Sequence, residues 1–252
     1  MENTMDKERQ EIRDMVVAAG RGPFTGWWAQ LLEFSPQSLL HIHRLQEIGE
    51  NDGPISPMMR HLIWVVADLA LMHLYPRGAG IHVRIALEEG ATFRQVMQAF
   101  EIATVVSIRG QRVGIPIILE AASEMGQPVP TRRIDDELRA RVIARCGHWA
   151  GWMDAVGSVS PEALTILVDL APGNDEEDGL DPRSRELLYF AAYCCPAVMD
   201  QEGMRIHARQ ALAAGATPQE LIQVLRLADC IGVHSIAEGV LSSSEHLSAR
   251  AK

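Results

Sequence analysis

The sequence predicts an all-α protein built from two tandem copies of one helical unit. Three observations lead to this prediction. The chain matches itself after a shift of 125 residues, helix-start signals recur at equivalent places in both halves, and no segment alternates polar and apolar residues with the period of two typical of strands. The first two observations define the repeat, and the third leaves helices as its elements.

The repeat needs no gap over about 95 residues. The stretch from Ile81 to Thr92 has the pattern I-H-x-R-x-A-L-x-x-G-A-T, and the stretch from Ile206 to Thr217 has the same pattern. We therefore expect an N-terminal helical extension (1–25), a first repeat (26–125), a linker and helix (126–150) and a second repeat (151–252). Two prolines and several charges favour a linker after the first repeat.

Within each repeat the helices begin at recognisable signals. Four dipeptides place an N-cap oxygen before a proline in the first helical position: Ser35-Pro36, Ser56-Pro57, Ser160-Pro161 and Asp181-Pro182. Thr92 with Gln95 and Thr217 with Glu220 form capping boxes, and the glycines just before them, Gly90 and Gly215, are typical helix C-caps. An amphipathic helix should follow each box, and 62–74 should form a nearly all-apolar buried helix.

Composition and charge limit the class of protein. The chain has 252 residues, of which 47% are hydrophobic, enough for a substantial core, and a formal net charge of -10. That charge provides no basic stripe for nucleic acid or for an anionic membrane. The N-terminus has no signal-peptide pattern, and no uninterrupted apolar run approaches the roughly 20 residues of a membrane span. We expect a cytoplasmic protein that binds neither nucleic acid nor membrane.

The four cysteines are Cys146, Cys194, Cys195 and Cys230. Two of them are neighbours in the sequence and are therefore poorly placed for a disulfide framework. We interpret all four as reduced thiols that pack as small apolar side chains.

The duplicated motif, HVRIALEEGAT from His82 and HARQALAAGAT from His207, resembles the carboxymuconolactone decarboxylase family, which includes the AhpD-type alkylhydroperoxidases. The resemblance covers nearly all of both halves and implies an AhpD-like helical bundle. It also implies a homo-oligomer, a trimer or a hexamer, because single-unit relatives form such rings. No dinucleotide or phosphate-loop motif is present, so no cofactor is expected.

The resemblance allows the peroxidase branch to be tested. That branch uses a C-x-x-C pair whose second cysteine lies four residues before the motif histidine, because its chemistry requires an accessible thiolate and a resolving thiol. Tyr75 and Gly78 occupy these places in the first repeat, and Asp200 and Gly203 occupy them in the second. Dithiol peroxidase activity is therefore argued against.

The decarboxylase branch implies different chemistry. Loss of CO₂ from a small lactone acid requires a general acid to deliver a proton, and histidine suits this because its pKa lies near neutral pH. In that branch a glutamate is often found near the motif histidine; Glu202 lies one position off the expected spacing, and Arg77 takes its place in the first repeat. This departure from the family's pattern affects whether the family's usual substrate is expected, and it leaves the expected fold unchanged.

The candidate catalytic residues are the repeated pair and the residues that differ between the repeats. His82 and His207 should each begin a helix after a glycine-containing break and point into a cleft. His73 and His234 are present in one copy only, and Glu186 stands where the peroxidase branch has a proton-relay glutamate. Arg60, Arg185 and Arg109 are candidates for binding a substrate carboxylate, because a guanidinium can donate paired hydrogen bonds.

These residues predict a lyase-like enzyme that acts on a small carboxylated or oxygenated ring compound by histidine acid/base chemistry. Two alternatives stay open: a non-catalytic helical ligand-binding or scaffold protein, and a histidine-based metalloenzyme. No metal site is predicted, because an unbroken helix would hold His61 and His73 about 18 Å apart. One working repeat and one supporting repeat are expected.

Overall fold

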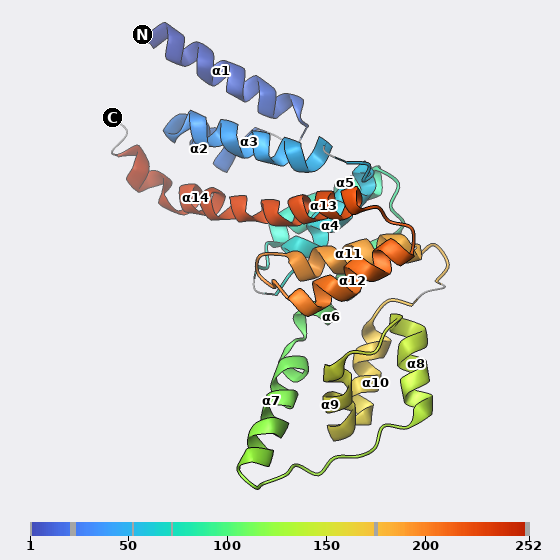
Figure 1. The fold of residues 1–252 in the computed structure, drawn as a ribbon. Coiled ribbons are helices and arrows are strands. Elements are labelled where there is room, and N and C mark those ends of the chain that lie inside the picture. Colours follow the sequence, from blue (N-terminus) through green and yellow to red (C-terminus); the bar gives the residue numbers. More distant parts are fainter. Residues whose placement is uncertain (1, 21–23, 52, 72, 174–175, 250–252) are drawn as a thin grey trace. The chain divides into compact units, whose positions relative to one another are not determined.

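The computed structural model describes residues 2–20, 24–51, 53–71, 73–173 and 176–249. Helices account for the regular structure in these residues, and no strand occurs in them (Figure 1). The all-α prediction is confirmed. In chain order the helices are α1 (Glu2–Ala18), α2 (Trp27–Phe34), α3 (Pro36–Asn51), α4 (Pro57–Asp68), α5 (Pro76–Glu88), α6 (Phe93–Ser107), α7 (Gly110–Glu124), α8 (Asp136–Cys146), α9 (Gly151–Val159), α10 (Pro161–Leu170), α11 (Pro182–Cys194), α12 (Gln201–Ala213), α13 (Pro218–Asp229), the short 3₁₀ helix η1 (Cys230–Val233) and α14 (His234–Ser248).

The duplication is visible in where these helices begin. Helices α3, α4, α5 and α6 begin at residues 36, 57, 76 and 93, and α10, α11, α12 and α13 begin at 161, 182, 201 and 218, each 125 residues later. The capping signals explain this regularity. In the second repeat, for example, Asp181 accepts a hydrogen bond from the Ser184 backbone N–H at 3.0 Å, and in the first Thr92 and Gln95 form both bonds of a capping box.

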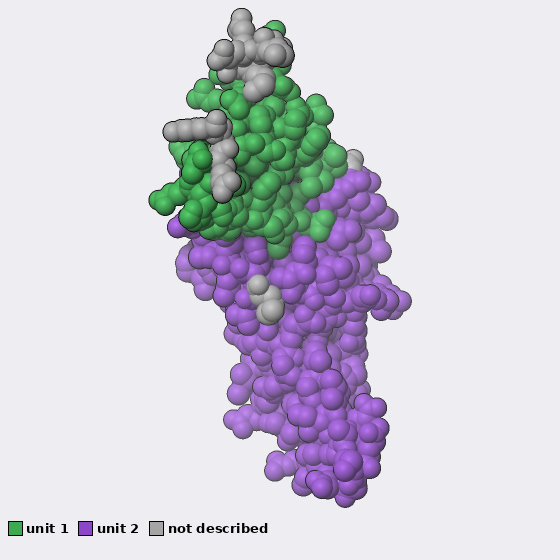
Figure 2. Space-filling view, turned by 90° about the vertical axis from the view of Figure 1, so that its left-hand side faces the viewer, with its two compact units in different colours: residues 1–53, 229–252 green, residues 54–228 purple. Residues whose placement is uncertain are grey.

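The chain forms two compact units that cut across the sequence repeats (Figure 2). One unit holds residues 1–53 and 229–252, and the other holds 54–228. In the smaller unit α14 packs on α2, and Ile12, Leu31 and Leu39 form part of the core. In the larger unit α4 packs on α5, α6 and α11, and α11 packs on α12.

The last helix of each repeat packs on the first helix of the other repeat. Within the larger unit α7 from the first repeat lies against α9 from the second, and within the smaller unit α14 lies against α2. This exchange of terminal helices explains why the compact units do not coincide with the repeats. The ranges 26–125 and 151–252 therefore mark the duplicated sequence. That each range folds as one unit stays a prediction.

Two local expectations are wrong. The predicted helix 62–74 ends at Asp68, and the chain turns through Leu74, whose φ of 37° is outside the helical region, before α5 begins. Gly78 and Gly203 lie inside α5 and α12 rather than in a break before the motif histidines. The reason at Gly203 is close packing: a Cβ there would lie 2.6 Å from Cγ of Tyr193.

One stretch, Phe93–Glu124, is apolar enough over sufficient length to cross a membrane, although no uninterrupted apolar run was found in the sequence. It consists of α6 and α7, and α6 contributes Val96, Ala99 and Ile102 to the core. A single such stretch does not by itself indicate a membrane protein. Helix α7 contains Pro116 and has no buried residue, and Ile117 and Ile118 are exposed on it.

Candidate active site

Three buried charged or ionisable residues of the second repeat form a connected group. His207 on α12 contacts Glu186 on α11 through Nδ1 and Oε2, 2.7 Å apart, and Arg185 donates to the other carboxylate oxygen from Nη2 at 3.0 Å. The three residues are 5%, 3% and 6% exposed, respectively. Because a carboxylate can only accept, His207 donates from Nδ1, and its Nε2 atom is left to take or release a proton.

The electrostatics keep this glutamate ionised. Burial would raise the pKa of Glu186, but the hydrogen bond and charge from His207 and the charge of Arg185 outweigh burial, so the pKa lies below its usual value. A carboxylate that stays ionised holds the imidazole in one tautomer and stabilises the imidazolium. This is the arrangement that a histidine proton donor requires.

Two tyrosines on α11 orient the imidazole further. The rings of Tyr189 and Tyr193 stack on His207, with centroids 4.5 Å and 5.1 Å away and interplanar angles of 14° and 13°. Arg112 on α7 donates to Tyr193 Oη at 2.7 Å and forms an ion pair with Asp200. Because α7 belongs to the first repeat, the helix exchange places a residue of one repeat at the site of the other.

A cavity opens beside this group within the larger unit. Its volume is about 60 Å³, room for several water molecules. Arg185, Glu186 and His207 line one part of it, and Trp152 and Tyr189 add apolar ring surface. Nη1 of Arg185 is buried and has no hydrogen-bond partner among the described residues, so an anionic oxygen in the cavity would satisfy it.

The predicted site residues therefore separate into two sets. His207, Glu186 and Arg185 meet at the cavity. Arg109 lies outside the cavity lining; its Nη1 donates to the carbonyl oxygen of Val198 at 2.8 Å, and it faces Asp200 at 3.6 Å. His234 is the first residue of α14 and belongs to the smaller unit.

The first repeat has a related group with different chemistry. Nδ1 of His82 on α5 lies 3.0 Å from Nδ1 of His61 on α4, which occupies the position equivalent to Glu186 (186 − 125 = 61). Trp64, equivalent to Tyr189, lies beside His82 with ring centroids 4.8 Å apart, and Arg60 on α4 is equivalent to Arg185. Two imidazoles thus replace an imidazole and a carboxylate, so the position equivalent to Glu186 carries no carboxylate of its own in the first repeat.

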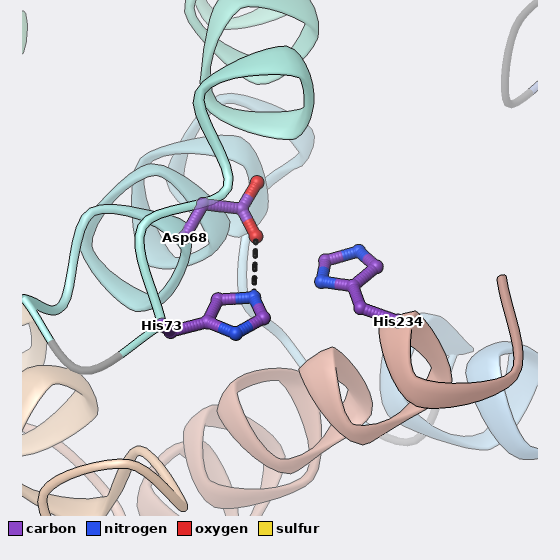
Figure 3. A group of neighbouring side chains, drawn as sticks. All are labelled: Asp68, His73 and His234. Atoms are coloured by element: carbon purple, nitrogen blue, oxygen red, sulfur yellow. Dashed lines mark ion pairs between the residues drawn. The ribbon is translucent and has the colours of Figure 1, made fainter. Parts of the chain in front are cut away.

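His73 follows the break after α4, which removes the separation from His61 that an unbroken helix would have imposed. Nε2 of His73 faces Oδ1 of Asp68 at 3.8 Å (Figure 3). Burial raises the pKa of Asp68 to about 8 and lowers that of His73. Both shifts favour the neutral forms of the two residues, so this pair is weakly charged near neutral pH.

Sequence reasoning missed several residues that line the cavity: Arg112, Cys146, His148, Tyr189 and Tyr193. Arg112 and His148 lie outside the duplicated motif and reach the cavity only through the packing of α7 and α9. Tyr189 carried a usable signal, since Tyr189 and Trp64 are aromatic at equivalent positions.

Cys146 lines the cavity but is a poor nucleophile. Burial raises the pKa of its thiol from 9.0 to about 11, although Arg145 and Arg185 oppose the shift. The folded protein at pH 8 should therefore hold about 100-fold less Cys146 thiolate than the unfolded chain, because two pKa units correspond to that ratio. Iodoacetamide labelling followed by mass spectrometry should show at least that slowing at Cys146; labelling of Cys146 at the rate of an unfolded cysteine would contradict it.

Comparison with known proteins agrees with this architecture. Residues 161–236 match the model of the carboxymuconolactone decarboxylase family. A solved structure from Burkholderia xenovorans LB400, described as a proposed gamma-carboxymuconolactone decarboxylase subunit, has the same fold, with a TM-score of 0.87 and 23% identity over 96% of this chain and 98% of that one. No curated protein matches the chain in sequence.

Proposed function

We propose that the protein is a carboxy-lyase-like enzyme acting on a small carboxylated or oxygenated ring compound, and the match of residues 161–236 to the carboxymuconolactone decarboxylase family model supports this proposal. The observation that carries the proposal is the Glu186–His207 pair, whose imidazole reaches a cavity that Arg185 also lines. In this proposal a proton donor and a cation for an acidic substrate line the same cavity.

The geometry suggests how the reaction would run. As the bond from the substrate to its carboxyl carbon breaks, CO₂ leaves and the electron pair moves into the ring system. His207 delivers the proton from Nε2 to the vinylogous carbon while Glu186 accepts the Nδ1–H hydrogen bond. The neutral imidazole then takes a proton back from solvent.

Arg185 accelerates this step only if it contacts atoms that gain negative charge. A cation on the departing carboxylate would stabilise the substrate more than the transition state and would slow the loss of CO₂. The buried Nη1 of Arg185 would therefore bind a ring carbonyl oxygen or a carboxylate that remains. This favours a substrate with two oxygenated groups.

The direct test is CO₂ release by the purified full chain from gamma-carboxymuconolactone and from hydroxylated ring acids. We expect Arg185→Lys to reduce kcat/KM by about tenfold or more, because lysine retains the charge but not the planar guanidinium, whose Nη2 binds Glu186 while Nη1 is available to the ligand. Arg205→Lys is a matched control, since Arg205 is exposed on α12 and the bond that it forms is to Gln201, four residues earlier on the same helix. Equal rates for both variants would contradict the role of Arg185.

Two alternatives use the same assay. A ligand-binding protein without catalysis would show thermal stabilisation by aromatic acids and no CO₂ release. A histidine-based metalloenzyme would contain stoichiometric metal in an elemental analysis of the purified protein. A cytoplasmic location and a trimeric or hexameric assembly stay predictions, and the exposed apolar side chains of α7 support the second.

A further inference from the structure

His148 lies in the short loop between α8 and α9 and lines the same cavity as His207. The two imidazoles have ring centroids 5.6 Å apart and are nearly perpendicular, at 88°. Sequence analysis did not single out this residue, and it has no part in the proton transfer described above. Its position in the cavity requires a separate explanation.

The loop fixes which nitrogen of His148 carries the proton. Nδ1 lies 2.9 Å from the backbone carbonyl oxygen of Cys146. A carbonyl can only accept, so Nδ1 must donate, and in the neutral imidazole Nε2 is then an unprotonated acceptor. The neutral form is favoured, because burial and the neighbouring His207 lower the pKa of His148 more than the Cys146 carbonyl and Glu186 raise it, and Arg112 acts in the same direction as burial.

The loop conformation is itself held by specific contacts. Gly147 has a φ of 76°, in the left-handed region that favours glycine, and closes α8. A Cβ at this position would overlap the side chain of Gln210 on α12, and Nε2 of Gln210 donates to the same Cys146 carbonyl at 3.0 Å. These contacts therefore hold His148 in the tautomer that is protonated at Nδ1.

The cavity thus presents two opposite polar requirements. Arg185 offers a buried donor that an anionic oxygen would satisfy. His148 offers an acceptor, which a carboxylate or lactone oxygen cannot satisfy, because neither carries a hydrogen to donate. A ligand that satisfies both directly must carry a hydrogen-bond donor in addition to a carboxylate, and a hydroxyl group is such a donor on an oxygenated ring acid.

From this geometry we infer that His148 is a specificity-determining hydrogen-bond acceptor and that the cavity selects hydroxylated acids over acids without a hydroxyl group. The inference rests on the proposed function only in taking the cavity as a site for small acids. It narrows the ligand class to ring acids with an O–H donor, whether or not the protein releases CO₂ from them.

The test compares matched ligands with matched variants. Benzoate, its three hydroxy isomers and the corresponding methoxybenzoates are titrated into the full-length protein by calorimetry. At least one hydroxybenzoate should bind about 3- to 10-fold more tightly than benzoate, the range expected for one neutral hydrogen bond, and its methoxy analogue should not. Using all three isomers covers different placements of the hydroxyl group relative to the carboxylate.

The variant His148→Asn separates ligand recognition from loop structure. The asparagine amide occupies the place of Nδ1 and keeps a donor for the Cys146 carbonyl, but it has no group at the place of Nε2. It should bind benzoate within about twofold of the wild type and lose the preference for the hydroxy acid. The exposed His41 on α3 provides the control His41→Asn, which should keep the preference.

Each other outcome has a defined meaning. If no hydroxy isomer binds more tightly than benzoate, or if the preference survives in His148→Asn, the inference is wrong while the proposed function stands. If none of these acids binds, the assignment of the cavity to small acids fails, and the proposed function loses its main support. Nitrogen-15 NMR of the ring should independently show Nε2 of His148 unprotonated; a protonated Nε2 would overturn the inference.

Discussion

Replacing His207 by asparagine should lower CO₂ release by about 100- to 10,000-fold, the contribution usual for a positioned general acid. The asparagine amide can still donate to Glu186 from the place of Nδ1, so the buried carboxylate keeps a partner. It has no counterpart of Nε2, the atom that delivers the proton in the proposed reaction. Rate measurements at saturating substrate, with circular dichroism to confirm folding, would show a loss in kcat rather than in KM.

The equivalent substitution in the first repeat, His82→Asn, decides which repeat works. His82 faces His61 at the position where His207 has Glu186, so we expect the rate to remain within a few-fold of the wild type. A large loss from His82→Asn together with a small loss from His207→Asn would move the active site to the first repeat. Large losses from both would show that the two repeats act together.

Gly203→Ala should destabilise the protein by about 1–3 kcal/mol, the usual cost of adding a methyl group to a close-packed site. The added Cβ would meet the ring of Tyr193 at Cγ, so the whole ring rather than its tip must move. That ring is held by stacking on His207 and by the hydrogen bond from Arg112. Thermal unfolding should show a Tm lower by several degrees, and catalysis should fall with it.

Gly80→Ala is the matched control for this prediction. Gly80 lies in α5, and a Cβ there would meet nothing within 4 Å. Alanine should raise stability by about 0.5–1 kcal/mol, since glycine is disfavoured inside helices. A Gly203→Ala variant as stable as Gly80→Ala would show that Tyr193 moves freely, and the stacked arrangement around His207 would then be wrong.

The helix starts could be predicted because they depend on local interactions. Ser56, Asp181 and Thr217 accept hydrogen bonds from residues three positions later, so short sequence spacing contains the whole signal. The end of α4 could not be predicted this way. Leu69 and Leu71 continue an apolar pattern, but the chain turns because Tyr75 donates its N–H to the carbonyl of Asp68.

The candidate site was predicted in part. Glu186 and His207 were found because the motif and the differences between the repeats marked them. His148 and Arg112 were not found, because their approach to His207 depends on how α7, α9 and α12 pack rather than on any spacing in the sequence. The break after α4 also brought His61 and His82 together, which a continuous helix would have prevented.

Because α7 packs on the other repeat, the site of the second repeat depends on a residue of the first. Arg112 is encoded in the first copy, yet it positions a tyrosine that stacks on the histidine of the second. A substitution at Arg112 in the first repeat would therefore alter the surroundings of His207 in the second. Recombination that replaced one repeat alone would separate Arg112 from Tyr193, so the two halves should be inherited and engineered as a single block.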